Sequence, residues 1–178
     1  ANIDSPAEYY NYNGNAWLPD ALYVFNGTYT SENATYGNSL NLSITGGTFN
    51  CTNEQGSAIA IYDLGKVAQN SQVTISGTAV LSTSASDRSA YQVLSLSDIG
   101  VSSPDSDYGN ANYVGKISTA ITGGTFSSDV SDYLSADYIC TQNSGENTYT
   151  VAMKEFVTVS TTTKSDGTVS ATIGGEAL

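Results

Sequence analysis

Histidine is absent from the 178 residues of the chain. Without an imidazole the chain cannot build Ser-His-Asp or Cys-His catalytic machinery, and it lacks a usual ligand of zinc sites. P-loops and dinucleotide fingerprints are missing too. The pairs Gly46-Gly47 and Gly123-Gly124 stand between strand-like segments and do not open a helix onto phosphate. These absences exclude the commonest nucleophilic, zinc-dependent and nucleotide-binding enzymes.

Positive charge is scarce. Five Lys and Arg residues face 17 Asp and Glu residues, which gives a formal net charge of −12. Such an acidic surface repels the phosphates of nucleic acid and the head groups of anionic membranes. It also disfavours acidic polysaccharides such as pectin, whose binding needs cations. We therefore expect no nucleic-acid partner.

Long apolar runs are missing, so we expect no membrane-spanning segment. The chain starts at Ala1 without Met or a signal-peptide pattern, and both of its ends look cut from something longer. We therefore expect either a mature form or an excised fragment, with neighbouring modules in a longer chain.

Cysteine is sparse. Cys51 and Cys140 are too few for a disulfide framework. Because a disulfide also needs a short distance between the two residues, we favour two buried free thiols over a bridge between them.

What the chain does contain is one phrase that recurs. Ile44-Thr45-Gly46-Gly47-Thr48-Phe49 is repeated letter for letter at residues 121–126, and a weaker copy lies at residues 75–80. Residues 25–29 look like a degenerate first copy. Each full copy ends an alternating strand, bends at glycine, where no β-carbon clashes, and resumes alternation. We call these segments glycine corners.

Glycine corners that recur at the same phase suggest a chain stacked on itself. Further strands are expected at residues 57–62 and 91–96. The expected fold is all-β, a right-handed parallel β-helix (a solenoid), with an antiparallel β-sandwich as the alternative. We expect a domain over residues 1–154 with an aromatic N-terminal cap. Residues 155–178 are expected to form a C-terminal hairpin or to begin a following module.

Local patterns predict three further elements. Residues 127–134 predict a short helix, because a serine stands at its start and Val130, Tyr133 and Leu134 share a face at helical spacing. Residues 138–141 and 148–151 predict a hairpin. A second hairpin is expected from residues 156–160 and 168–173 around a turn at residues 165–167, packed on the helix or belonging to the next module.

The last glycine corner carries a resemblance. Residues 121–134, ITGGTFSSDVSDYL, followed by Tyr138 and Thr148-Tyr149-Thr150-Val151, resemble a unit of the large repetitive surface proteins of gut-dwelling bacteria. Those are adhesin-like proteins with pectate-lyase-like, right-handed parallel β-helix repeats. The resemblance covers residues 22–151 and rests mainly on the glycine corners outside the last unit. It implies an extracellular location, at the cell surface or secreted, and no catalytic residues.

Two stretches are candidate binding sites. The first is the aromatic N-terminal stretch with Tyr9, Tyr10, Tyr12 and Trp17, and the second is the long insertion at residues 97–115 with Tyr108 and Tyr113. The N-terminal aromatics suit stacking on sugar rings, but we favour a cap over the first open sheet edge, since edges need protection.

A calcium site is the one cofactor that the sequence suggests. Asp105 and Asp107 offer oxygens at alternating positions, as calcium loops do. The glycine at residue 109 comes one position early for an EF-hand, and no glutamate closes the loop. We therefore favour a solvated turn and no cofactor.

The preferred function is a non-catalytic extracellular module of a bacterial surface protein, an adhesin or a structural stalk. Its expected partner is a host or microbial glycan or a surface protein. The alternative is a carbohydrate-binding or carbohydrate-active domain of the glycoside hydrolase or lyase type, because a glycosidase needs only a pair of carboxylates. The chain has many acids, so a pair by chance discriminates little, and we lean away from an enzyme.

Overall fold

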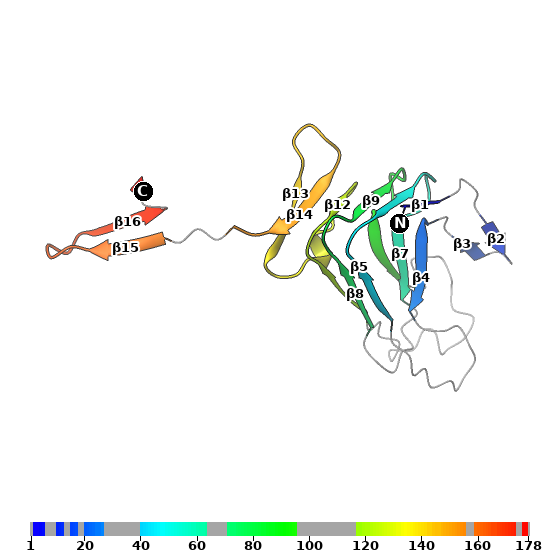
Figure 1. Ribbon diagram of the computed structural model, residues 1–178, viewed down its shortest axis with the longest axis horizontal. Helices are drawn as coiled ribbons and strands as arrows, with labels where there is room; N and C mark the ends of the chain where they lie inside the picture. Colours follow the sequence, from blue (N-terminus) through cyan, green and yellow to red (C-terminus); the bar gives the residue numbers. More distant parts are fainter. Residues whose placement is uncertain are drawn as a thin grey trace.

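The computed structural model of the chain describes residues 2–5, 10–12, 15–17, 20–26, 40–63, 71–95, 117–155, 159–173 and 176–177. Within these residues the regular structure is almost entirely β (Figure 1). The one helix among them is η1 (Ser131–Tyr133), a single 3-10 turn. The strands belong to five sheets, three of which share one apolar core.

The largest sheet has six strands and mixed pairing. Its order is β1-β6-β9-β12-β14-β13. The strands are β1 (Asn2–Ser5), β6 (Thr48–Cys51), β9 (Val80–Thr83), β12 (Thr125–Phe126), β14 (Tyr149–Met153) and β13 (Tyr138–Gln142). The first four pair in parallel, whereas β14 and β13 form an antiparallel hairpin added to β12.

Two three-stranded sheets are parallel throughout. One is β4 (Leu22–Asn26), β7 (Ile59–Asp63) and β10 (Tyr91–Ser95), with β7 in the middle. The other is β5 (Asn41–Ile44), β8 (Ser71–Ile75) and β11 (Ile117–Ile121), with β8 in the middle. Between β5 and β10 the chain therefore visits the three sheets in turn and then visits them again in the same order.

Two small antiparallel sheets complete the described structure. One is β2 (Tyr10–Tyr12) with β3 (Asn15–Trp17), and the other is β15 (Val159–Thr163), β16 (Val169–Ile173) and β17 (Glu176–Ala177). Figure 1 shows the β15–β16 hairpin at the left, apart from the larger sheets. Both hairpins expected in the second half of the chain are present. The expected domain boundary and the aromatic cap stay predictions.

The prediction of a right-handed parallel β-helix was wrong, because the sheets are mixed and do not form a solenoid. Parallel strands share the six-stranded sheet with an antiparallel pair, and two further sheets are antiparallel. The antiparallel sandwich fails as well, since β4 to β12 pair in parallel. Alternation and glycine predict strands and bends, but neither specifies the direction in which a strand pairs.

Two local predictions also change. Phe25 of the degenerate copy at residues 25–29 lies in β4, in a different sheet from the strands that end at Ile44, Ile75 and Ile121, and residues 27–29 lie outside the described residues. Of the helix expected over residues 127–134, only the single 3-10 turn η1 forms. Its hydrogen bond is of the 3-10 type, because Tyr133 N–H donates to the carbonyl oxygen of Val130, three residues earlier, at 3.0 Å.

The core is built from equivalent positions on neighbouring strands. Ile44, Ile75 and Ile121 are register partners across β5, β8 and β11, and all three are buried. Phe49, Leu81 and Phe126 repeat this on β6, β9 and β12. The β4–β7–β10 sheet closes the core with buried apolar side chains, Ile59, Ile61 and Tyr91. Apolar and polar residues alternate along the strands because only one face of each strand points into this core.

The glycine corners lie directly against one another. A β-carbon added at Gly77, where φ is +64°, would lie 2.3 Å from the carbonyl oxygen of Thr45 in the neighbouring corner. A β-carbon at Gly123 would lie 2.9 Å from the Gly77 nitrogen. Both distances are shorter than any van der Waals contact, so glycine is required because backbone meets backbone there. The corners thus hold the strands in register.

We expect Gly77→Ala to destabilise the chain much more than Gly145→Ala. Both glycines have positive φ, so each alanine is strained by about 1 kcal/mol. Only Gly77 also has a backbone atom in the way, whereas nothing lies within 4 Å of a β-carbon at Gly145. The free energy of unfolding, measured by urea titration, should fall by about 3 kcal/mol or more for Gly77→Ala. Equal losses for the two variants would contradict the close approach of the corners.

Candidate functional site

The structure describes only part of the binding sites expected from the sequence. Tyr9, Tyr108, Tyr113, Asp105 and Asp107 lie outside the described residues. Both the second binding stretch and the calcium site therefore stay predictions.

The N-terminal aromatics are described as backbone only. Tyr10 and Tyr12 lie in β2 and Trp17 lies in β3, and the ladder sets Tyr10 opposite Trp17. The backbone thus brings two of the expected ligand-binding residues together. Among the described residues, no group of three or more Cys, Asp or Glu side chains is placed to hold a metal ion.

One polar group in the described structure joins a carboxylate, a hydroxyl and a thiol. Asp129 Oδ1 accepts hydrogen bonds from the Ser131 nitrogen at 2.8 Å and from Ser131 Oγ at 2.5 Å. These bonds hold the pKa of Asp129 below its usual range. Cys140 of β13 lies beside them, and its thiol pKa is raised, mostly by burial and further by the nearby Asp129 charge.

The electrostatics of this group do not suit catalysis. A nucleophilic thiol needs a lowered pKa and a general acid needs a raised one, and both shifts here run the other way. Asp129 accepts from Ser131, two residues along the chain and the first residue of η1, which is a local turn formed by an Asp side chain. The group is therefore structural, and the one half-exposed thiol in it is a poor nucleophile.

Tyr91 is the largest fully buried side chain among the described residues and is also structural. Its hydroxyl forms a hydrogen bond with Thr119 Oγ1 at 2.7 Å, and its ring meets the Tyr133 ring edge-on at 4.9 Å between centroids. Burial raises the pKa of Tyr91, so the hydroxyl stays protonated. Tyr133 in turn accepts the Val93 N–H at 3.3 Å. Through these contacts β10 is joined to Thr119 of β11 and to Tyr133 of η1.

The largest described sheet, the six-stranded one, has one face turned away from the core. Phe49, Leu81, Phe126 and Val151 point into the core, so their strand neighbours point outward. We define the outer face as the outward residues of β6, β9, β12, β14 and β13, which are Thr48, Asn50, Val80, Ser82, Thr125, Thr150, Ala152, Ile139 and Thr141.

A row of β-branched residues crosses this outer face. The register partners, strand by strand, are Thr48, Val80, Thr125, Thr150 and Thr141. Neighbouring strands are about 4.8 Å apart, so hydroxyl and methyl groups recur at that interval over roughly 20 Å. In the next row Ser82 Oγ donates to Asn50 Oδ1 at 2.7 Å. The outer face is therefore regular.

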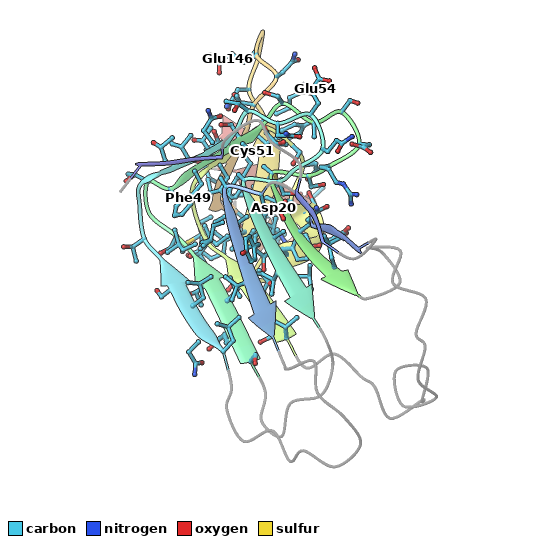
Figure 2. All side chains as sticks on the ribbon, turned by 90° about the vertical axis from the view of Figure 1, so that its right-hand side faces the viewer. Asp20, Phe49, Cys51, Glu54 and Glu146 are labelled. Carbon is cyan, nitrogen blue, oxygen red and sulfur yellow. The ribbon has the colours of Figure 1, made fainter. Side chains whose placement is uncertain are left out.

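The nine residues of the outer face carry no charge, but Asp4 of β1 is the register partner of Asn50 in the same sheet. Further described carboxylates lie on loops beside these strands. Glu54 follows β6, and Glu146 lies in the turn between β13 and β14, where it accepts from Thr148 Oγ1 at 2.8 Å. Figure 2 shows both glutamates projecting at the top of the view. The five strands from β6 to β13 therefore present few charges for a chain of net charge −12.

Sequence reasoning missed the outer face as a site, although part of its signal was visible. Thr48 and Thr125 occupy the same place in the repeated phrase. Thr150 and Thr141 join the row only because β14 adds to β12 in antiparallel fashion, which the phrase does not reveal.

Comparison with known proteins adds no assignment, because no family model, curated protein or solved structure matches the chain. None of the described helical segments has the length and apolar character needed to cross a membrane.

The two thiols should react very differently with iodoacetamide. Cys51 is fully buried and should stay unlabelled in the native chain, whereas Cys140 is partly exposed and should react slowly. Because burial raises the pKa of Cys140, its alkylation rate should reach half of its maximum at a higher pH than the rate of a fully exposed thiol does. Mass spectrometry of labelled peptides against pH measures both rates.

The variant Asp129→Asn tests whether the Asp129 charge contributes to the raised pKa of Cys140. Removing the charge should lower the pKa of Cys140 and speed its alkylation at neutral pH, although burial keeps the pKa above that of a free thiol. Asp132→Asn removes an exposed charge from the same turn and serves as the control. Identical pH profiles for both variants would show that Asp129 does not act on the thiol.

Proposed function

We propose that the chain is a non-catalytic extracellular module of a bacterial surface protein, acting as an adhesin or a structural stalk. The observation that carries the proposal is the regular outer face, whose nine residues carry no charge, set on a core shared by three sheets. A regular strand face suits adhesion or spacing, whereas catalysis needs reactive groups that converge in a concave site.

Several of the described carboxylates support a non-catalytic role, because they accept hydrogen bonds from their own chain. Asp166 accepts from Thr168 N at 2.9 Å and from its hydroxyl, which lowers the pKa of Asp166. Asp20 is buried and accepts the Ser57 N–H at 2.7 Å. A glycosidase acid would need a raised pKa beside a second carboxylate.

The extracellular and bacterial parts of the proposal rest on composition and resemblance. Only 12% of the residues are charged, so hydroxyl and amide groups supply most of the polar surface, as in many extracellular β-proteins. The resemblance of residues 121–134 to repetitive bacterial surface proteins points the same way.

A carbohydrate-binding role is the second candidate. It is favoured by the β2–β3 ladder, which sets Tyr10 opposite Trp17. Aromatic rings are the usual partners of sugar rings, and a pair of them on a short hairpin would suit one or two sugar units.

A glycan array with and without calcium, together with a cleavage assay on neutral polysaccharides, tests the two candidates. We expect no cleavage products under any condition, and their appearance would overturn the non-catalytic proposal. Binding that Tyr10→Ala and Trp17→Ala abolish, but that Tyr23→Ala on β4 preserves, would establish the carbohydrate-binding candidate. Binding that needs calcium would assign the site to Asp105 and Asp107. The absence of binding leaves a stalk or a protein receptor.

A further inference from the structure

We propose that residues 127–135 form a cap over the free edge of β10 and the last residue of β11, and that this cap keeps strands of other copies of the chain from pairing there. We call this segment the hydroxyl cap, because three of its side-chain hydroxyls accept backbone N–H groups from residues between Thr83 and Val93. This inference goes beyond the proposed function, because it requires neither a ligand nor a location.

The hydroxyl cap begins where the two copies of the repeated phrase part. After the copy at residues 44–49 the strand β6 continues to Cys51. After the identical copy at residues 121–126 the strand β12 ends at Phe126, and Ser127 follows. The phrase itself is the same, so the difference between a continued strand and a strand that stops lies in the residues that come after it.

Three hydroxyls of the cap accept backbone N–H groups that no described strand takes up. The bonds run from Thr83 N to Ser127 Oγ at 2.9 Å, from Ala90 N to Ser128 Oγ at 2.8 Å and from Val93 N to Tyr133 Oη at 3.3 Å. Val93 lies in β10, which pairs with β7 along its other edge. The Tyr133 hydroxyl therefore takes the place that a carbonyl oxygen of a further strand would occupy.

The last residue of β11 is covered by the backbone of the cap. Ile121 forms a parallel bridge with Leu134, and its carbonyl oxygen accepts the Ser135 N–H at 3.3 Å. The opposite edge of β11 pairs with β8. A strand of another copy would have to displace Leu134 before it could pair along the whole of β11.

Apolar contacts hold the cap in place. Val130 is 1% exposed and belongs to the core that the three sheets share. The Tyr133 ring meets the buried Tyr91 ring edge-on, at 4.9 Å between centroids. Both contacts fix the backbone of the cap, so its hydroxyls stay directed at the strands.

The two covered strands lack protection of their own. β10 reads YQVLS and β11 reads ISTAI, so neither contains a charge or a proline. Edge strands are usually protected by charges, by proline, by bulges or by a segment that covers them. For these two strands the covering segment is the protection that the structure provides. Without it their free backbone groups would be available to a strand of a second copy.

Native-state hydrogen exchange of the unchanged chain gives the first test. We expect the amides of Thr83, Ala90 and Val93 to exchange far more slowly than the amide of Gly145 in the exposed turn, because the cap hydroxyls hold them. If Ala90 and Val93 exchanged as fast as Gly145, the proposal would be overturned, since the hydroxyls would then not hold the edge.

A double variant, Ser128→Ala with Tyr133→Phe, gives the second test. It removes two acceptors and keeps almost all of the side-chain volume. The amides of Ala90 and Val93 should exchange about tenfold faster or more, because each loses the hydrogen bond that protected it. In sedimentation velocity, from about 10 μM to about 1 mM, this variant should associate about tenfold more strongly than the unchanged chain, because its cap opens more often.

The control is the double variant Ser131→Ala with Tyr138→Phe, which makes the same two chemical changes outside these contacts. The Ser131 hydroxyl bonds to Asp129 in the same turn, and Tyr138 lies in β13. The control should exchange and associate like the unchanged chain. Circular dichroism and urea titration check that both double variants fold.

Two further results would each overturn the proposal. The first is a folded cap variant whose Ala90 and Val93 amides exchange at the rates of the control. The second is a folded cap variant whose association constant equals that of the control, because a second copy then does not use the edge. The exchange test on the unchanged chain applies even if the cap variant fails to fold. None of these results bears on the glycan assays above, which depend on Tyr10 and Trp17.

Discussion

The close approach of backbone at the glycine corners is the constraint on which the three-sheet core depends. The Thr45 carbonyl oxygen lies where a side chain at Gly77 would begin, and the Gly77 backbone lies where a side chain at Gly123 would begin. Backbone hydrogen bonds continue this contact, from Ser76 N–H to Ile44 O at 2.8 Å and from Thr122 N–H to Ile75 O at 2.9 Å. Because the corners are in such close contact, the strands on either side of them can pair in only one register.

That register aligns the inner and the outer faces together. With the corners in contact, Phe49, Leu81 and Phe126 meet in the core, and Thr48, Val80 and Thr125 necessarily meet on the outside, since successive side chains alternate. The packing that stabilises the chain therefore also sets the row of β-branched residues on the outer face. Three of the described acidic residues, Asp129, Glu146 and Asp166, lie in turns and accept hydrogen bonds from a residue two positions along the chain.

The sequence predicts the elements of this structure better than their arrangement. Alternation located the strands that contain Ile44, Ile75 and Ile121, and turn residues located both late hairpins. The β-helix prediction failed because the alternation of apolar residues is the same in parallel and antiparallel strands. The local sequence of β14 therefore does not show that it pairs with β12 in antiparallel fashion. The helix prediction failed because a bond from Ser131 to Asp129 competes with helical bonding. The candidate surface depends on residues up to β14, so it could not be found from any one repeat.

Native-state hydrogen exchange by NMR tests most directly whether the corners hold the three sheets together. We expect the amides of Ser76, Val80, Thr122 and Thr125, which donate across neighbouring corners, to exchange only through global unfolding. Their opening free energies should equal the free energy of unfolding from urea titration, and the exposed turn at Ser144 and Gly145 should exchange far faster. Corner amides that exchange as fast as this turn would contradict the account, because the corners would then open while the core stays folded.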